Sequence, residues 1–532
     1  MPAISGGDAL AVSLKSHDVN TIFGLPGVQI YGAMEGLYNQ SEIEFITTRH
    51  EQAATYMADG YSRSSGQVGV SLVVPGPGLQ NASAGIGTAY AASSKVLSIS
   101  GQIPRDMIGV ERGLLHEIND QLDLIRPITK WSTRVLNASE IPEAVSEAFY
   151  HLNTGRPRPV HIEIPPEALS ESSDFSLPEK GSYTQTSPNK QSLINAASLI
   201  HSSKNPLIIS GGGTISSNAG EQLIRFAELL QAPIITTPEG KGSIDERHPL
   251  SIGSLRTRND PYNSLISNHD LIIAIGTRLS FPEILSDQDV LQIDIDPEEI
   301  GRNYKKTHGV IGDASLSLFE ISNEIEHKLL SNQNRYSEIA KLRDYRLDEN
   351  MRVSPHDEYL KAIRSALPED GIFVSGMTQV GYYSRGFFPT YYPRTFFTSS
   401  YFGNLGYAFP FALGAKVANP DKPVVAITGD GGFMFNVQEL STAARYGINT
   451  ITILFNDNAF GNVKRDQKTL YNGHTIGSDL SNPDFMKLSE SFGITGIHVT
   501  SPQDLQHAII SSLDSTKPVL IEVPYGPTPY PF

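Results

Sequence analysis

Continuous apolar runs alternate with amphipathic segments along almost the whole chain. Six of these runs are "KVLSISG", "NPLIISGGG", "DLIIAIG", "VLQIDID", "KPVVAITGDG" and "NTITILFND". Their apolar residues are contiguous, as in strands of a parallel sheet that is covered on both faces. The segments between them carry apolar residues at helical spacing, such as Ala54, Met57, Ala58 and Tyr61. The pattern therefore predicts an α/β fold built from doubly wound parallel sheets.

Two polar stretches interrupt this alternation. One begins at Ser170 with "SESSDFSLPEKG" and the other begins at Ser331 with "SNQNRYSEIAKL". Both have the composition of linkers, and a chain of 532 residues is too long for a single core. We therefore expect three domains of the same α/β class, at 1–170, 190–330 and 355–532.

Composition and charge exclude several classes of protein. The net charge of −16 argues against nucleic acid as a partner, because few phosphates could be neutralised. The chain has no cysteine, which rules out disulfides, thiolate nucleophiles and cysteine-based metal sites. The first residues lack the features of a signal peptide, and no apolar run is long enough to span a bilayer. We therefore expect a cytoplasmic protein with no membrane partner.

Two polar turns follow consecutive buried strands near the C-terminal end. "GDGG" follows the first strand and "NDN" follows the second, so that Asp457 lies 27 positions after Asp430. Glycine amides at a helix start favour a phosphate, and carboxylates suit Mg²⁺. Because parallel strands carry both turns to the same edge of a sheet, the two aspartates could share one ion.

This pair of turns resembles the signature of enzymes that use thiamine diphosphate. The resemblance implies that Mg²⁺ is held by Asp430, Asp457 and the backbone carbonyl of Ala459. It also implies that the diphosphate lies on the amides of Gly431 and Gly432. The chain departs from the signature at Asp457, where asparagine is usual, and this departure adds a negative charge.

Segments near the N-terminus resemble the pyrimidine-binding domain of the acetolactate synthase-like branch of that family. They are "FGLPG", "TTRHEQAATYMADGYSR" and "VVPGPGLQNASAGIGTAY". The resemblance implies that Glu51 activates the cofactor by hydrogen bonding to its pyrimidine ring. It also implies that Pro26 and Asn81 contribute to cofactor binding. By itself, Glu51 would be an ordinary acidic residue at the start of a helix.

Segments in the last domain resemble the diphosphate-binding domain of the same branch. "SGMTQVGYYS" implies contacts with the diphosphate side of the cofactor from Thr378 and Gln379. "YFGNLGYAFPFALGAK" implies that Gly403 accepts a hydrogen bond from the pyrimidine amino group and that Leu405 separates the two rings. Leucine is more often a core residue, but the flanking glycines favour close approach of a ligand.

The substrate pocket differs from that of the acetolactate synthases. His116 stands where they have a glutamine, and Asp466 stands where they have a tryptophan. A histidine can shuttle protons near neutral pH, so His116 is the candidate proton donor and acceptor. Gln29 stands where some carboligases and lyases have a histidine, and because it does not titrate we expect it to orient substrate.

The implied activity is the cleavage or formation of a carbon–carbon bond on a 2-oxo acid or a related carbonyl compound. Alternatives are a lyase or hydrolase of an acyloin or 1,2-dione, a non-catalytic paralogue that binds the cofactor, and a NAD- or FAD-dependent oxidoreductase. FAD in the central domain stays open but is not favoured, since "GTRLSFPE" lacks the acidic–arginine run of flavin-binding members. The family also implies a homodimer or homotetramer in which Glu51 of one subunit faces Asp430 of another.

Overall fold

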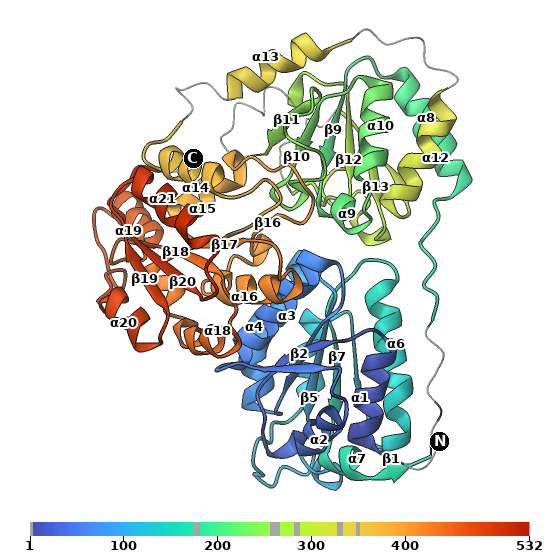
Figure 1. The fold of residues 1–532 in the computed structure, drawn as a ribbon. Coiled ribbons are helices and arrows are strands. Elements are labelled where there is room, and N and C mark those ends of the chain that lie inside the picture. Colours follow the sequence, from blue (N-terminus) through green and yellow to red (C-terminus); the bar gives the residue numbers. More distant parts are fainter. Residues whose placement is uncertain are drawn as a thin grey trace.

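The computed structural model describes residues 4–174, 176, 181–255, 266–280, 288–326, 334–346 and 352–530. Parts of both predicted linkers and residues 281–283 of "GTRLSFPE" lie outside this set. The chain forms three α/β domains, each built on a six-stranded parallel sheet with helices on both faces (Figure 1). The predicted fold class is therefore confirmed.

The first sheet has the strand order β3-β2-β4-β5-β7-β6. Its strands are β2 (Thr21–Gly24), β3 (Glu44–Thr47), β4 (Gly69–Val73), β5 (Val96–Gly101), β6 (Trp131–Arg134) and β7 (Val160–Ile164). The helices around it are α1 (Gly6–Ser16), α2 (Tyr31–Asn39), α3 (Glu51–Ser65), α4 (Pro77–Ala92), α5 (Gln121–Ile125), α6 (Ile141–Asn153) and α7 (Pro166–Ser170). A short antiparallel pair, β1 (Ile4–Ser5) with β8 (Ser172–Ser173), joins the two ends of this domain.

The central sheet has the order β11-β10-β9-β12-β13-β14. Its strands are β9 (Pro206–Ser210), β10 (Ile234–Thr236), β11 (Ser251–Ser254), β12 (Leu271–Ile275), β13 (Asp289–Asp294) and β14 (Thr307–Ile311). The helices of this domain are α8 (Lys190–Ser202), α9 (Gly212–Ser216), α10 (Gly220–Leu230), α12 (Ala314–Glu326) and α13 (Tyr336–Arg346). Counted from its own first strand, this order is the one that dinucleotide-binding folds have.

The third sheet has the order β16-β15-β17-β18-β20-β19, which repeats the topology of the first sheet. Its strands are β15 (Ile372–Ser375), β16 (Phe396–Phe397), β17 (Val424–Gly429), β18 (Ile451–Asn456), β19 (Thr495–His498) and β20 (Val519–Pro524). Its helices are α14 (His356–Ala366), α15 (Gln379–Phe387), α16 (Ala408–Ala418), α17 (Asp430–Phe433), α18 (Leu440–Tyr446), α19 (Gly461–Leu470), α20 (Phe485–Ser491) and α21 (Pro502–Ser512).

Helices α3 and α16 join the first and third domains (Figure 1). They pack backbone against backbone: a Cβ atom on Gly60 would lie 2.0 Å from the carbonyl oxygen of Phe411, and one on Gly414 would lie 1.9 Å from that of Met57. One hydrophobic cluster runs through both domains and includes Met57 and Leu413. The two domains therefore share a core.

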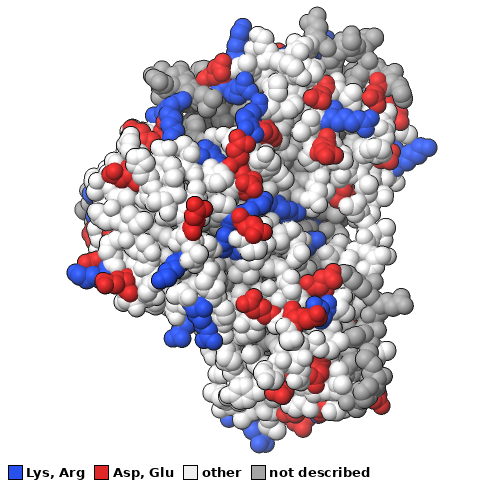
Figure 2. All heavy atoms as spheres, viewed as in Figure 1, with Lys and Arg blue, Asp and Glu red and all other residues white. Residues whose placement is uncertain are grey.

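Ion pairs connect the central domain to its neighbours. Arg63 of α3 pairs with Glu239 at 2.7 Å, and Arg247 pairs with Glu369 at 2.7 Å. Positive and negative side chains are interspersed over the face in Figure 2. Of the helices described, none is both long enough and apolar enough to cross a bilayer.

The close approach of α3 and α16 predicts that Gly414→Ala destabilises the protein by about 3 kcal/mol, because the added methyl group overlaps a backbone carbonyl. Urea unfolding, followed by the fluorescence of the single tryptophan, Trp131, measures this change. Gly212→Ala is the control, since its Cβ atom would meet other atoms only at 3.4 Å or more. Equal stability of the two variants would contradict this account of the interface.

Candidate active site

Loops at the carboxyl ends of β15 and β17 form the first half of the site. These two strands are neighbours in the sheet, and the strand order reverses between them, which is where α/β folds bind ligands. Thr378 and Gln379 follow β15, and both are buried. A Cβ atom on Gly429, at the end of β17, would lie 3.7 Å from that of Thr378. The two loops are therefore in contact.

The glycine-rich turn differs from its predicted form. The stretch "NVQELSTAARYG" after this turn has the spacing of one continuous helix, with Gly447 as its C-terminal stop. Instead, Asp430 begins the short helix α17, a 3₁₀ turn covers Val437–Glu439, and α18 begins only at Leu440. Gly431 and Gly432 thus lie in the first turn of α17, where helix amides lack partners within the helix.

Two carboxylates approach each other at this edge of the sheet. Asp430 is almost fully buried, and Asp457 follows β18. Burial and the neighbouring charge of Asp430 raise the pKa of Asp457 to about 6. Paired carboxylates in this state favour a divalent cation, which neutralises both. Ala459 lies two residues after Asp457, and its backbone N–H donates to Asp457 Oδ1 at 3.3 Å.

Asn482 completes this cluster and was not anticipated from the sequence. Its Nδ2 atom donates to Asp430 Oδ2 at 2.6 Å and lies 3.0 Å from Asn456 Oδ1 and 3.1 Å from Asn458 Oδ1. It comes from the loop before α20, in "DLSNPDF", which has the composition of an ordinary turn. Nothing in that stretch indicates a ligand site.

The segment between the 3₁₀ turn Ser400–Phe402 and α16 carries Gly403 and Leu405. Gly403 is in the left-handed region at φ +64°. Leu405 lies beside Gly432, whose Cβ atom would be 4.0 Å from the Cδ2 atom of this leucine. Asn404 Oδ1 accepts from the hydroxyl of Thr88 in α4 at 3.1 Å, and Asn404 Nδ2 donates to the hydroxyl of Tyr56 in α3. The first domain therefore holds this segment in place.

Loops after β2 and β4 form the second half of the site, at the matching reversal of strand order in the first domain. Pro26 precedes Gly27, whose Cβ atom would lie 2.2 Å from Val74 Cγ1. Glu51 is the first residue of α3, and its Oε2 atom accepts from Asn81 Nδ2 at 3.1 Å.

Gln29 and His116 lie beside this second half. His116 Nδ1 is 2.9 Å from Gln29 Oε1. The carbonyl oxygen of His116 packs on Gly76, where a Cβ atom would be only 2.3 Å away. The residues predicted for the pyrimidine-binding side thus gather around one loop, 74–78.

A buried carboxylate fixes the start of α3. Glu439 comes from the third domain and has no exposed surface. Its two oxygens accept from the backbone N–H of Arg49 at 3.0 and 3.1 Å, and burial raises the pKa of Glu439 to about 7. Nearby, Asn436 Nδ2 lies 3.4 Å from Gln52 Oε1. The position of Glu51 therefore depends on both domains.

Contacts such as Asn404 with Thr88 join the two domains, but the acidic residues of the two halves do not meet within the described part of one chain. Among the described residues, no hydrogen bond joins Glu51 or His116 with Asp430 or Asp457. On the third domain, Arg465 Nη1 donates a hydrogen bond to Gln379 Oε1 at 3.0 Å. The sequence did not indicate this contact.

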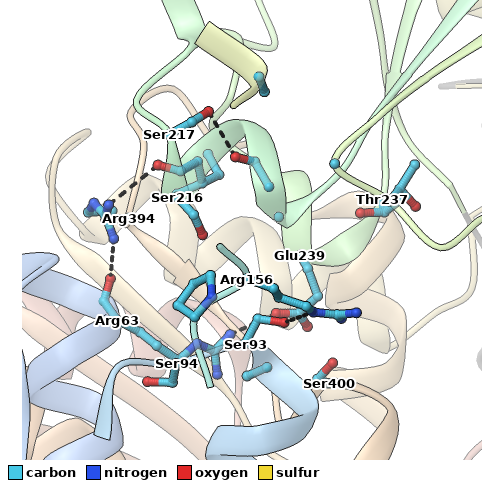
Figure 3. Close-up of a pocket in the computed structure, with 18 of the residues that line it drawn as sticks. Arg63, Ser93, Ser94, Arg156, Ser216, Ser217, Thr237, Glu239, Arg394 and Ser400 are labelled. Carbon is cyan, nitrogen blue, oxygen red and sulfur yellow. Dashed lines mark hydrogen bonds and ion pairs between the residues drawn. The ribbon is translucent and has the colours of Figure 1, made fainter. Parts of the chain in front are cut away.

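A separate cavity of about 750 Å³ lies where the three domains meet (Figure 3). The start of α9 contributes Gly213 and the loop after β12 contributes Gly276. A Cβ atom on Gly213 would lie 2.6 Å from the Cα atom of Gly276. Arg63, Arg156 and Arg394 point toward its interior from the neighbouring segments (Figure 3). This cavity is distinct from the two halves described above.

Family models match each domain in turn. The N-terminal binding domain of thiamine pyrophosphate enzymes matches residues 4–124, their central domain matches 193–321, and their C-terminal binding domain matches 376–523. These matches follow the order of the three sheets.

Curated relatives match over nearly the full length. A probable acetolactate synthase large subunit from Methanocaldococcus jannaschii is 35% identical over 98% of this chain and 92% of the relative. The acetolactate synthase large subunit of Haemophilus influenzae is 33% identical, over 95% and 91%. A probable 2-ketoarginine decarboxylase from Pseudomonas aeruginosa is also 33% identical, over 94% and 90%.

The chain belongs to the thiamine pyrophosphate enzyme family, in which thiamine diphosphate is the cofactor. The resemblance to its acetolactate synthase-like branch is confirmed. These relatives also support an enzyme that depends on thiamine diphosphate and has a carboligase or decarboxylase type of activity.

Proposed function

We propose that this enzyme makes or breaks a carbon–carbon bond next to the carbonyl group of a 2-oxo acid or a related compound, with thiamine diphosphate and Mg²⁺. The observation that carries the proposal is the pairing of Asp430 and Asp457 beside glycine amides, together with a separate carboxylate, Glu51, at the equivalent edge of the first domain. The acetolactate synthases and the 2-ketoarginine decarboxylase among its relatives support this class of reaction.

The residues of the third domain fit the diphosphate end of the cofactor. We assign Asp430, Asp457 and the carbonyl of Ala459 to Mg²⁺, because oxygen ligands suit this ion and the two carboxylates repel each other without it. The amides of Gly431 and Gly432 would bind the diphosphate. The remaining assignments on this side are Thr378, Gln379, Gly403 and Leu405.

The residues of the first domain fit the pyrimidine end. When bound, thiamine diphosphate supplies a nucleophilic carbon and an electron sink. We assign Glu51 to hold a proton at the pyrimidine ring, oriented by the Asn81 amide, with Pro26 on the same side. His116 would take a proton from the substrate and return it. General acid–base groups of this kind contribute factors of about 10² to 10⁴ in rate.

We also propose a homodimer or homotetramer with its active sites between subunits. Apolar side chains are exposed around both halves of the site, and such surfaces mark protein interfaces. They are Val28, Tyr31 and Leu115 on the first domain and Phe402, Met434 and Phe435 on the third. A partner that covers these surfaces would bring its own Glu51 to Asp430. A cytoplasmic location also remains a prediction.

The central cavity bears on FAD, which the sequence left open. It has room for a nucleotide-sized ligand, but Arg63 pairs with Glu239 at 2.7 Å and Arg156 with Asp296 at 3.4 Å. The part of "GTRLSFPE" at 281–283 is outside the described residues. FAD therefore stays open and not favoured, and the absorbance spectrum of the purified protein tests it.

The raised pKa of Asp457 predicts a pH-dependent affinity for Mg²⁺. Protonation removes the charge of this ligand, so affinity falls as the pH falls through about 6. At pH 5 we expect binding about tenfold weaker than at pH 7.5. Calorimetric Mg²⁺ titrations at saturating thiamine diphosphate measure this. The diphosphate also titrates, so the affinity is compared with that of Asp457→Asn, which lacks the pH dependence due to Asp457. An identical pH dependence of Mg²⁺ affinity in both proteins would refute the assignment.

Mixing two inactive variants tests the shared site. Glu51→Gln and Asp430→Asn are expected to be inactive alone. If each site combines Glu51 and Asp430 from different subunits, every mixed dimer contains one intact site, and random co-assembly restores about a quarter of wild-type activity. Assay of the unfractionated co-expressed protein measures this, and mixed dimers isolated through two different affinity tags should have about half of wild-type activity. Activity no higher than that of the single variants would mean that both residues act within one chain.

A substrate panel tests the reaction itself. NMR would follow pyruvate, benzoylformate, benzoin, cyclohexane-1,2-dione and 2-ketoarginine with thiamine diphosphate and Mg²⁺. We expect turnover of at least one compound, and a loss of about 100-fold or more in Glu51→Gln but not in Glu35→Gln, an exposed glutamate of the same domain.

The product distinguishes the alternatives. Acetolactate from pyruvate supports a synthase, whereas cleavage of only the dione or the acyloin supports a lyase or hydrolase. Cofactor binding without turnover of any compound favours a non-catalytic paralogue. Turnover that persists in Glu51→Gln, or without thiamine diphosphate, would contradict the proposed chemistry.

A further inference from the structure

Gln29 and His116 form a pair whose hydrogen bonds have a defined direction. Gln29 follows β2 in a short 3₁₀ turn and is only 6% exposed. Its Nε2 atom donates to the backbone carbonyl of Leu115 at 3.1 Å, and its Oε1 atom lies 2.9 Å from His116 Nδ1. Both polar ends of the glutamine amide are therefore engaged by the loop that carries the histidine.

The carbonyl of Leu115 determines which nitrogen of His116 carries the proton. A carbonyl oxygen can only accept, so the amide NH₂ of Gln29 must face Leu115. The amide oxygen then faces His116, and an oxygen without hydrogen can only accept from Nδ1–H. In the neutral imidazole the lone pair is consequently on Nε2, the nitrogen that Gln29 does not contact.

The backbone holds the histidine in a conformation that few residues adopt. His116 has φ +69°, in the left-handed region. Its carbonyl packs on Gly76, which itself has φ +57° and donates its N–H to Gln121 Oε1 at 2.6 Å. A residue persists in such a conformation only where its surroundings impose it, and such residues concentrate at functional sites.

The charged groups on the surrounding elements have other partners. Glu117 Oε2 accepts from the N–H of Leu114 at 2.7 Å. Behind Gln121, Glu163 accepts from Gln121 at 3.1 Å and from Arg134. On the other side of loop 74–78, Glu51 accepts from Asn81. Gln29 is thus the side chain that contacts the imidazole ring through a hydrogen bond in the described structure.

We propose that Gln29 is a positioning residue that fixes the tautomer of His116, so that Nε2 is the atom that accepts and returns the substrate proton. The inference rests on the proposed function of His116. It gives Gln29 an indirect role in place of the direct contact with substrate that the sequence suggested, because the nitrogen and the oxygen of its amide both bond to the loop that carries His116. Gln29 and His116 then act as one unit.

The first test uses the protein without substrate or cofactor. Diethyl pyrocarbonate modifies neutral imidazole, and mass spectrometry follows the His116 peptide against pH. Gln29→Glu places a carboxylate at Nδ1, so the pH of half-maximal reaction should rise by about one unit. Gln67→Glu adds the same charge at an exposed position of the same domain and should cause no rise. No rise with Gln29→Glu, or equal rises, would overturn the pairing.

The second test is a double-mutant cycle on a substrate that the enzyme turns over. Gln29→Leu should lower kcat by about tenfold to a hundredfold with little change in KM, because a displaced catalytic group slows chemistry. In a His116→Gln background it should have no further effect, since residues that act as one unit are not additive. Additive losses, or a change in KM alone, would overturn the proposal in favour of direct substrate contact.

The two tests separate the inference from the function on which it rests. Wild-type activity in His116→Gln would refute the proposed role of this histidine, and with it the catalytic use of the tautomer. The carbethoxylation result would still report on the pair itself, because it requires neither cofactor nor turnover.

Discussion

The packing of α3 against α16 is the constraint on which the active site depends. Two glycines, Gly60 and Gly414, let the helix backbones touch, and no larger residue fits at either position. The same helix α3 begins with Glu51, and Glu439 of the third domain binds the backbone just before it. A buried carboxylate is stable there because the backbone N–H of Arg49 and the hydroxyl of Thr442 donate to its oxygens. The interface between two domains therefore determines where Glu51 lies.

The three sheets also explain why chemistry gathers where it does. Each sheet has two adjacent strands between which the strand order reverses: β2 and β4, β9 and β12, and β15 and β17. Loops after these strands diverge to opposite faces and leave a crevice between them. The first and third crevices carry the residues assigned to thiamine diphosphate. The central crevice opens into the cavity between the domains, which therefore has the same structural origin.

Much of this could be predicted from the sequence. Contiguous apolar runs indicated strands buried on both faces, and the spacing of Asp430 and Asp457 indicated neighbouring turns at one sheet edge. Local signals were sufficient there because strand, turn and helix follow each other directly in the chain. The prediction of one continuous helix after "GDGG" was wrong. The structure has α17, a 3₁₀ turn and α18 there, and helix propensity alone does not indicate these breaks. Contacts between residues far apart in the sequence could not be predicted. Asn482 bonds to Asp430 across 52 positions, and Glu439 bonds to Arg49 across 390.

The central claim is that Glu51 activates thiamine diphosphate bound at the third domain. Exchange of the hydrogen on the reactive thiazolium carbon for deuterium reports this activation without any substrate. NMR of the cofactor after brief mixing with the protein in D₂O and acid quenching measures its rate. The account predicts exchange accelerated about 100-fold or more over free cofactor, and a loss of this acceleration in Glu51→Gln with cofactor still bound. Equal exchange rates in the wild-type protein and in Glu51→Gln would contradict it.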